Sequence, residues 1–273
     1  MRTPDEHPRW LPAQRARIDE SGCPRTVDAH CHCLPGIDDG PPTLEDAMEL
    51  LAALADDGFT TIIATPHQLG SYDRENGPKK VRKLVAQTAV EAAARGIPIE
   101  LVPGADVRID ERLMGLLDTD QVLTVADCGR HLLLELPHGQ YLDPSPLFAP
   151  LAERGVQVVM THPERHRYLR QDLVIVERWV DDGALVQVTA GSLLGDFGEG
   201  AYQAGWELVS WGLCHIVATD AHCVARRPPR MSAAIEALRD QAPEWAVRRM
   251  CHENPYRLLT GQAVPAGQLS ESD

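Results

Sequence analysis

The chain has 273 residues, of which 44% are hydrophobic and 24% charged, and its formal net charge is −14 at pH 7. A chain of this length and composition can bury one large core, so we expect a single folded domain. The excess of acidic residues argues against binding to nucleic acid, because such binding relies on clustered lysine and arginine.

The N-terminal residues 1–24 are polar and are expected to form a flexible extension. They lack the apolar core of a signal peptide, and no later stretch approaches the roughly 20 apolar residues of a membrane span. We therefore expect a cytoplasmic protein without membrane insertion. Its seven cysteines are expected to be reduced thiols rather than disulfides.

Short apolar, β-branched runs alternate with helical patterns along the rest of the chain. The helical patterns at 43–58 and 81–96 both end in glycine, and the first opens with Thr43 followed by acidic residues, a normal start signal. This alternation predicts parallel strands joined by crossover helices, and the continuous apolar runs predict strands buried on both faces. The predicted strands are 26–30, 60–66, 99–104, 131–137, 156–162, 184–190 and 214–220.

A barrel and a doubly wound sheet both fit this alternation, and the positions of the polar side chains favour the barrel. Histidine, aspartate or glutamate stands at or just past the C-terminal end of each predicted strand except 184–190. In a (β/α) barrel these ends converge on one face, where catalytic residues from different strands meet. The residues are His30, His32, His67, Asp106, Glu135, His162, Asp220 and His222.

Two pairs of these residues have the spacing of ligands that share a cation. His30 and His32 are two apart on a strand, so their side chains point the same way, roughly 6.6 Å apart. Either this pair or Asp220 and His222 alone would more often be ordinary polar residues, but the repeated spacing favours a metal site. Asp39 in the turn IDDG offers a further oxygen, although Asp-Gly turns are common.

These motifs resemble the PHP superfamily, named for polymerase and histidinol phosphatase. The resemblance is strongest to its bacterial branch of manganese-dependent protein tyrosine phosphatases of capsule and exopolysaccharide synthesis. The polar, proline-containing tail at 263–273 is expected to be flexible. The resemblance implies a distorted (β/α)7 barrel over residues 25–262. It runs from about Thr26 to Arg257, through DAHCHCLPGIDDG, IIATPH, PGADVRI, LLLELP, THPERH, VTAGSLLGDFG and ATDAHCVARRPPRM.

The resemblance also implies a cluster of three divalent metal ions. Nitrogen and oxygen donors without thiolate suit manganese, iron, zinc or magnesium, and the resemblance favours manganese. Most relatives have glutamate at the position of Asp106, and we expect the barrel to have adjusted so that the shorter side chain still bridges two ions. The implied ligands are His30, His32, Asp106 and Asp220 for one ion, Asp106, Glu135 and His162 for a second, and Asp39, His67 and His222 for a third.

Two arginines near these ligands are expected to bind phosphate. Arg165 follows His162 in HPERH, and Arg227 lies in the loop after ATDAH. Taken singly, each would more often be a solvated loop charge. A guanidinium group can contact two phosphate oxygens at once, and the resemblance implies that both arginines are catalytic, in a metal-assisted hydrolysis without a phosphoenzyme.

The function implied by the resemblance is dephosphorylation of tyrosine in a protein. The expected substrate is the phosphorylated tail of a bacterial tyrosine kinase that regulates capsular or exopolysaccharide synthesis. Two alternatives stay open: a phosphoesterase of the same barrel type acting on histidinol phosphate or a nucleotide, and a non-catalytic metal-binding interaction domain. The set of ligands with two arginines argues against the non-catalytic domain, because a structural site is closed by four ligands and needs no phosphate-binding groups.

A rival motif lies near the C-terminus, where Cys251 and Arg257 have the C-x5-R spacing of cysteine-dependent tyrosine phosphatases. The segment contains no glycine that could turn backbone N–H groups toward a phosphate. We therefore favour a helix that starts near Asn254, with Pro255 at its first position. Six further cysteines and histidines complete no ligand spacing and are expected to be structural: Cys31, Cys33, His131, His138, His166 and His215.

Overall fold

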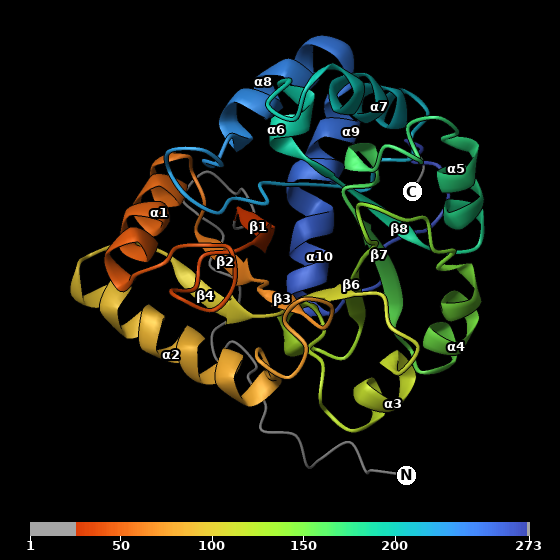
Figure 1. Ribbon diagram of the computed structural model, residues 1–273. Helices are drawn as coiled ribbons and strands as arrows, with labels where there is room; N and C mark the ends of the chain where they lie inside the picture. Colours follow the sequence, from red (N-terminus) through yellow and green to blue (C-terminus); the bar gives the residue numbers. More distant parts are fainter. Residues whose placement is uncertain (1–25, 272–273) are drawn as a thin grey trace.

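A computed structural model describes residues 26–271 (Figure 1). The predicted flexible extension at 1–24 lies outside the described residues. Within them, nine strands form two parallel sheets, in the orders β1-β2-β4 and β3-β5-β6-β7-β8-β9. The strands are β1 Val27–Cys31, β2 Thr61–Ala64, β3 His67–Gln68, β4 Glu100–Pro103, β5 Asp106–Arg108, β6 His131–Glu135, β7 Gln157–Thr161, β8 Leu185–Thr189 and β9 Ile216–Ala218.

Each predicted strand is present, and two of them continue after a break as separate strands. β2 stops before Pro66, which has no N–H for the ladder, and the chain resumes as β3. β4 stops before Gly104, which lies so close to the neighbouring strand that a Cβ there would be 2.9 Å from Ile63 Cγ2. After both breaks, His67 and Asp106 are paired in register on β3 and β5.

β1 joins the two sheets at its C-terminal end. The Asp220 N–H donates to His30 O (2.8 Å), and the His32 N–H donates to Ala221 O (2.9 Å), just after β9. On the other side of β1, the Thr65 N–H donates to Cys31 O (2.9 Å). The strands therefore surround a common centre with their C-terminal ends on one face, which confirms the predicted distorted (β/α) barrel.

Helices pack around the outside of the strands, and α10 lies behind the ring of strands in Figure 1. Thr43 caps α1 as its sequence pattern predicts, because its Oγ1 accepts from the Asp46 N–H (3.2 Å). The helices are α1 Leu44–Asp56, α2 Pro78–Ala94, α3 Leu113–Asp118, α4 Phe148–Glu153, α5 Val174–Asp181, α6 Ala190–Leu193, α7 Glu199–Ser210, α8 Met231–Gln241, α9 Glu244–Arg248 and α10 Asn254–Thr260. Short 3₁₀ turns lie at Val125–Asp127, Ser145–Leu147 and Pro163–Arg165, and a π-helical turn lies at Arg249–Glu253.

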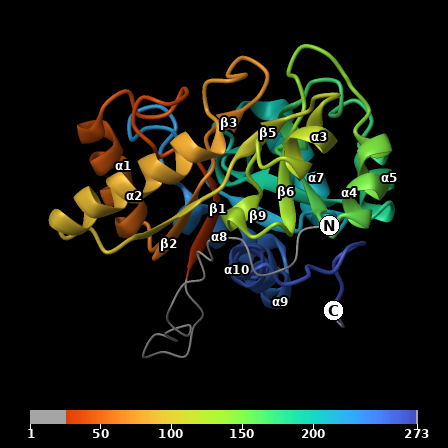
Figure 2. The same ribbon diagram turned by 90° about the horizontal axis from the view of Figure 1, so that it is seen from below.

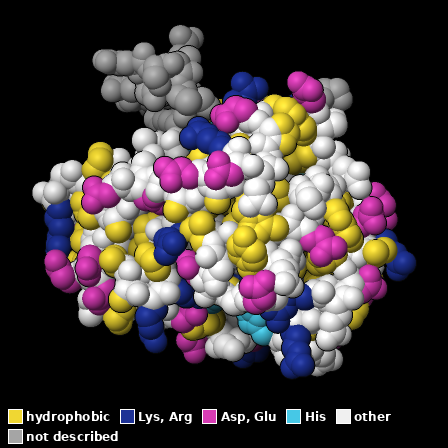
Figure 3. All heavy atoms as spheres, turned by 90° about the horizontal axis from the view of Figure 1, so that it is seen from above, with side chains coloured by type: hydrophobic (Ala, Val, Ile, Leu, Met, Phe, Trp, Pro, Cys, Tyr) yellow, Lys and Arg dark blue, Asp and Glu magenta, His cyan; other side chains and the backbone are white. Residues whose placement is uncertain are grey.

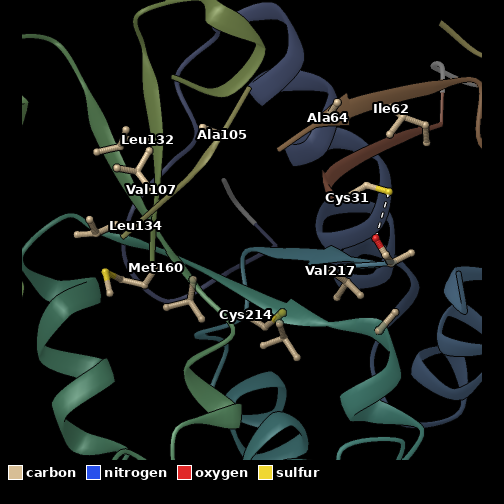
Figure 4. Close-up of a cluster of buried hydrophobic side chains, with 14 of the residues drawn as sticks. Cys31, Ile62, Ala64, Ala105, Val107, Leu132, Leu134, Met160, Cys214 and Val217 are labelled. Atoms are coloured by element: carbon tan, nitrogen blue, oxygen red, sulfur yellow. Dashed lines mark hydrogen bonds between the residues drawn. The ribbon is translucent and has the colours of Figure 1, made fainter. Parts of the chain in front are cut away.

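The core has two layers because side chains alternate along each strand. Leu133 and Val159 belong to an inner cluster that Leu258 and Leu259 of α10 close on one side. Their strand neighbours point outward into the larger cluster between strands and helices (Figure 4). The labelled members of this outer cluster include Leu132, Leu134, Met160, Val107 and Val217.

The helix predicted near Asn254 is present as α10, but it does not begin at a free end. α9 continues through the π-helical turn Arg249–Glu253 directly into α10. Asn254 is therefore not a cap. It is fully buried, and its Nδ2 donates to His215 O (2.9 Å), which ties the helix to the strand side of the core.

Residues 263–271, expected to belong to a flexible tail, pack against the barrel. Val264 is buried, and His215 Nε2 donates to Gly267 O (2.9 Å). The Leu269 N–H donates to Gly212 O (2.8 Å). In both polar contacts the tail contributes only backbone atoms, so they could not be predicted from its amino-acid sequence.

The cysteines in the described part of the chain match the expectation of reduced thiols. Its six cysteines are all free, and Cys31 and Cys33 are buried as predicted. None of its helices combines the length and the apolar character needed to cross a membrane.

Candidate metal centre

The residues predicted as metal ligands meet at the C-terminal ends of the strands. Each comes from a strand end or from the loop that follows it, so the barrel topology brings together positions far apart in the sequence. Their donor atoms form four overlapping groups, within each of which the atoms lie less than 4.8 Å apart. The groups are His30-His32-Asp220, His30-Asp106-His162, His67-Asp106-Glu135 and His32-Asp39-His67-His222.

His30 and His32 direct their Nε2 atoms to the same point. These two atoms are 3.2 Å apart, and each lies 3.4 Å from Asp220 Oδ1. The Nδ1–H of His30 donates to Gln187 Oε1 (2.9 Å), and that of His32 donates to Asp38 Oδ2 (2.8 Å). With Nδ1 protonated in this way, the lone pair of each Nε2 is free to bind a cation.

Asp38 holds the loop after β1 in place, although the sequence interpretation singled out only its neighbour Asp39. Besides the His32 ring, its carboxylate accepts from the backbone N–H groups of His67 (3.1 Å) and Gly40 (3.0 Å). Residue 40 must be glycine, because a Cβ there would lie 2.4 Å from His32 O. The IDDG turn therefore supplies one carboxylate to the histidines and leaves Asp39 facing the cavity.

Asp106 lies between two of the donor groups. Its Oδ2 is 3.7 Å from His30 Nε2 and 3.4 Å from His67 Nδ1. The side chain is completely buried, and neither carboxylate oxygen has a hydrogen-bond partner among the described residues. A buried carboxylate without donors is costly, and a divalent cation is a fitting partner for it. The residues present therefore fit a metal cluster.

Glu135 lies close to both His67 and His162, and the prediction joined it to His162. Its Oε2 lies 3.4 Å from His67 Nδ1, whereas its Oε1 lies 3.9 Å from His162 Nε2. His162 also belongs to a donor group with His30 and Asp106. Ligand sharing is decided by how far each strand end reaches into the centre, and a spacing pattern does not contain that information.

Asp39 marks the side of the cluster that faces solvent. Its Oδ1 lies 3.5 Å from His67 Nε2 and 3.3 Å from His222 Nε2. The side chain of Asp39 is 51% exposed, whereas those of His67 and His222 are 16% and 3% exposed. A ligand or substrate can therefore approach the cluster from the Asp39 side.

The protonation states suit cation binding. Burial lowers the pKa of both His32 and His162 well below the usual range, and neutral imidazole is the form that coordinates metals. Burial also opposes a charge on His67, but the carboxylates of Asp106 and Glu135, each 3.4 Å from its Nδ1, outweigh it and raise the pKa of His67 to about 11. The carboxylates at the centre thus stabilise positive charge placed among them.

Two of the candidate ligands have strained backbones. His162 follows β7 with φ 35°, and Asp220 follows β9 with φ 49°, both in the left-handed region that non-glycine residues rarely adopt. Their N–H groups are held by Gln187 O (2.9 Å) and His30 O (2.8 Å) of the neighbouring strands. Such strain, on the order of 1–3 kcal/mol per residue, is typical of functional sites, and here it occurs where each strand ends at the cluster.

Arg165 and Arg227 meet at a single carboxylate. Both guanidinium groups form ion pairs with Asp220 Oδ2, while Oδ1 of the same side chain faces His30 and His32. The Cζ atoms of Arg165 and Arg227 lie 4.2 and 5.8 Å from the ring centroid of Phe197, for which the sequence interpretation gave no role. Two arginines share one carboxylate oxygen, so positive charge remains for an anion in the cavity.

The glutamate of the HPER motif fixes the position of the neighbouring Arg165. Glu164 is completely buried, and its Oε1 accepts from the Thr189 N–H (3.0 Å) and from Ser192 Oγ (2.7 Å). These bonds fix the 3₁₀ turn Pro163–Arg165 against the segment after β8. The motif thus combines a candidate ligand, an anchored turn and a cation in consecutive residues.

Both arginines and several candidate ligands line one cavity of about 230 Å³. Histidine side chains reach the surface at one edge of the molecule, beside basic and acidic side chains (Figure 3). Tyr72 and Arg108, which had no predicted role, line the same cavity: the Tyr72 ring stacks on His67 at 5.7 Å, and Arg108 Nη2 lies 2.8 Å from Glu135 Oε2. His138, which was expected to be structural, lines the cavity as well. Arg108 was detectable, because it lies two residues after Asp106 on the same strand.

The rival motif around Cys251 has neither the loop nor the thiolate that its chemistry needs. Cys251 is completely buried in the helical segment between α9 and α10. Burial raises the pKa of its thiol to about 12, so the nucleophilic form is strongly disfavoured near neutral pH.

Comparison with known proteins shows the same relatives from sequence and from structure. The family described as capsular polysaccharide synthesis, CpsB/CapC, matches residues 26–260. Tyrosine-protein phosphatase YwqE of Bacillus subtilis is 34% identical over 242 residues, which are 87% of this chain and 93% of that protein. A putative tyrosine-protein phosphatase CapC of Staphylococcus aureus is 31% identical over 203 residues, 74% of this chain and 79% of that protein.

A solved structure is also similar. It comes from work on YwqE from Bacillus subtilis and CpsB from Streptococcus pneumoniae, described as unique metal-dependent tyrosine phosphatases. The match has a TM-score of 0.83 at 32% identity and covers 90% of this chain and 100% of the other.

Proposed function

Since the chain belongs to the CpsB/CapC family of capsular polysaccharide synthesis, we propose that it is a metal-dependent protein tyrosine phosphatase. The observation that carries this proposal is the arrangement around Asp106. A buried carboxylate without hydrogen-bond donors lies among histidines and acids, and two arginines line the same cavity.

The proposed cofactor is a cluster of three divalent ions, with manganese favoured and iron, zinc or magnesium as substitutes. Bound ions would supply Lewis-acid stabilisation and an activated water at neutral pH. The charge of the site supports this number, because several ionised carboxylates are needed to balance three divalent cations. The residues that would hold the ions are His30, His32, Asp39, His67, Asp106, Glu135, His162, Asp220 and His222.

Arg165 and Arg227 are proposed to bind the phosphoryl oxygens and to stabilise the negative charge that develops on them. The Phe197 ring and the anchored HPER turn hold the two guanidinium groups in place before the substrate arrives. A preorganised donor of this kind contributes about 2.7–4 kcal/mol to lowering a reaction barrier. The leaving group would be a phenolate, whose conjugate acid has a pKa near 10, so no general acid is assigned.

The proposed substrate is phosphotyrosine in a protein, in particular the tail of a bacterial tyrosine kinase that regulates capsular or exopolysaccharide synthesis in the cytoplasm. The tyrosine phosphatases among the relatives support the phosphotyrosine part of this proposal. The family description supports its connection to polysaccharide synthesis.

A substrate panel tests the proposed function. We expect the manganese-loaded protein to hydrolyse a phosphotyrosine peptide with a kcat/KM at least about tenfold above that for a phosphoserine peptide, histidinol phosphate or a nucleoside monophosphate. The reason is that a phenolate leaves more readily than an alkoxide when no general acid is present. Initial rates of phosphate release at matched manganese concentration provide the measurement. A higher kcat/KM for histidinol phosphate would replace the proposal by a small-molecule phosphoesterase on the same barrel.

A further inference from the structure

All lysines of the chain lie in one short segment. They are Lys79, Lys80 and Lys83, and every other basic residue of the 273 is arginine or histidine. The three lysines occupy the first two turns of α2, and all are exposed. Lysine is a flexible, strongly hydrated point charge that can follow a mobile anionic partner, whereas arginine favours fixed planar contacts.

The lysines line a groove of about 780 Å³, which we call the lysine groove. It lies between the loop 69–77, the start of α2 and residues near α3. Its walls carry six basic side chains and three carboxylates, although the whole chain has a net charge of −14. The charged residues are Arg74, Lys79, Lys80, Arg82, Lys83 and Arg112, with Asp73, Glu75 and Asp120.

Arg82 and Arg112 of the lysine groove are held by carboxylates, whereas the lysine charges are available. Arg82 is held by Asp120 and Asp127, each at 2.7 Å. By contrast, Lys79 and Lys83 form no ion pair with any residue in the range 26–271, and the closest polar contact of Lys80 is with Asn76 Oδ1 at 3.4 Å. An anionic group entering the groove would therefore not need to displace an internal carboxylate from the lysines.

The lysine groove adjoins the metal cavity. Leu69 and Tyr72 line both, and the Tyr72 ring stacks on His67 of the candidate metal centre. The loop 69–77 leads from β3 at the centre of the barrel to the start of α2 (Figures 1 and 2). A phosphorylated side chain in the cavity would thus leave neighbouring residues of its own chain beside the lysines.

We propose that the lysine groove binds an anionic segment of the protein substrate, next to the phosphotyrosine that enters the metal cavity. This inference rests on the proposed phosphatase function and adds a determinant of substrate choice. The recognised chemistry is negative charge carried by a peptide, which aspartate and glutamate or a second phosphotyrosine can provide. Exposed charges of this kind steer and orient a partner, and their effect falls as ionic strength rises.

Two phosphotyrosine peptides that differ only in their flanks test the lysine groove, one with acidic and one with neutral residues. A third peptide carries a second phosphotyrosine in the neutral flank, so the two sources of charge are compared. The variant is Lys79→Gln/Lys80→Gln/Lys83→Gln, which keeps much of the side-chain length. Its matched control is Arg178→Gln/Arg239→Gln/Arg248→Gln, which removes the same charge from exposed positions on α5, α8 and α9.

For the wild type we expect the kcat/KM of the acidic peptide to exceed that of the neutral one about tenfold at low salt, with most of the difference in KM. The lysine variant should lose this preference, and the arginine control should keep it. Turnover of p-nitrophenyl phosphate, which is too small to reach the groove, should be the same in all three proteins. Equal KM values for charged and neutral peptides in the wild type would overturn the proposed role of the lysine groove. Loss of the preference for the acidic peptide in the arginine control would overturn it as well.

Failure of the phosphatase proposal gives a different result, because no phosphotyrosine peptide would then be hydrolysed. The lysine groove is still tested in that case by fluorescence anisotropy of a labelled acidic peptide without phosphotyrosine. Binding that weakens with salt and is lost only in the lysine variant supports the groove. Absence of such binding to the wild type contradicts it.

Discussion

Replacing His162 with alanine should reduce the turnover of a phosphotyrosine peptide on the order of 10³-fold. His162 is buried, and burial keeps its imidazole neutral, so the side chain supplies a donor nitrogen suited to a cation. Removing one donor from the group with His30 and Asp106 should also lower the bound manganese. Both quantities can be measured on one sample, as phosphate release and as metal content by elemental analysis.

Cys251→Ser is the matched test of the rival chemistry. This substitution removes the thiol of the C-x5-R segment, which is buried and has a pKa of about 12. We expect wild-type activity and wild-type metal content, with circular dichroism confirming the fold of both variants. An inactive Cys251→Ser protein with its full metal content would contradict metal-dependent catalysis.

Asp106→Ala should remove metal from two positions at once and abolish activity. The reason is that Asp106 belongs to two donor groups, one with His30 and His162 and one with His67 and Glu135. Without this carboxylate, the first group has no acid and the second has only Glu135. That is too little negative charge to hold two divalent ions. We expect a loss of turnover on the order of 10³-fold, together with the loss of more than one manganese per chain by elemental analysis.

Asp106→Glu tests whether the site is fitted to aspartate or whether the shorter side chain leaves the metal cluster incomplete. Asp106 is completely buried and its Oδ2 already reaches both His30 and His67 within 3.7 Å, so an added methylene should overfill the site. We expect a lower kcat at saturating manganese than in the wild type. The isosteric variant Asp106→Asn is the control, since it keeps the shape and removes the charge. A gain in both manganese content and kcat for Asp106→Glu would show instead that the natural aspartate leaves the cluster incomplete.

The sequence was sufficient to predict the barrel and the residues that meet at its centre. Each strand end has a fixed direction in a parallel barrel, so His30, Glu135 and Asp220 could be assigned to one face without knowledge of contacts. The breaks before Pro66 and Gly104 were harder to foresee, because a single proline or glycine also occurs in ordinary loops. Those two breaks place His67 and Asp106 side by side on β3 and β5.

The hydrogen-bond partners of the histidines could not be predicted from sequence. Gln187 is 157 residues from His30 in the chain. It lies on an apolar strand, where the sequence alone does not distinguish it from any other buried polar residue. Asp38 and Asp39 are adjacent in one turn, and only the fold decides which one supports His32 and which one faces the cavity. Such choices depend on side-chain direction after packing, which a linear pattern does not encode.

The grouping of the donors was also beyond the sequence. The assignment of Glu135 and His162 to one ion stays a prediction, while the donor groups place Glu135 with His67 and Asp106. A resemblance between motifs transfers the identity of residues, whereas distances depend on how far β3 and β6 reach into the barrel. Continuation of α9 into α10 likewise depends on packing, because Asn254 donates to His215 O rather than capping a free helix end.

Removal and return of metal tests the central claim most directly. The protein is stripped with a chelator, and its metal content and its hydrolysis of a phosphotyrosine peptide are followed together as manganese is added back. The account predicts that turnover is lost with the metal and returns only as the bound manganese approaches three per chain, while the fold persists by circular dichroism. Undiminished phosphotyrosine hydrolysis by the folded, metal-free protein would contradict it.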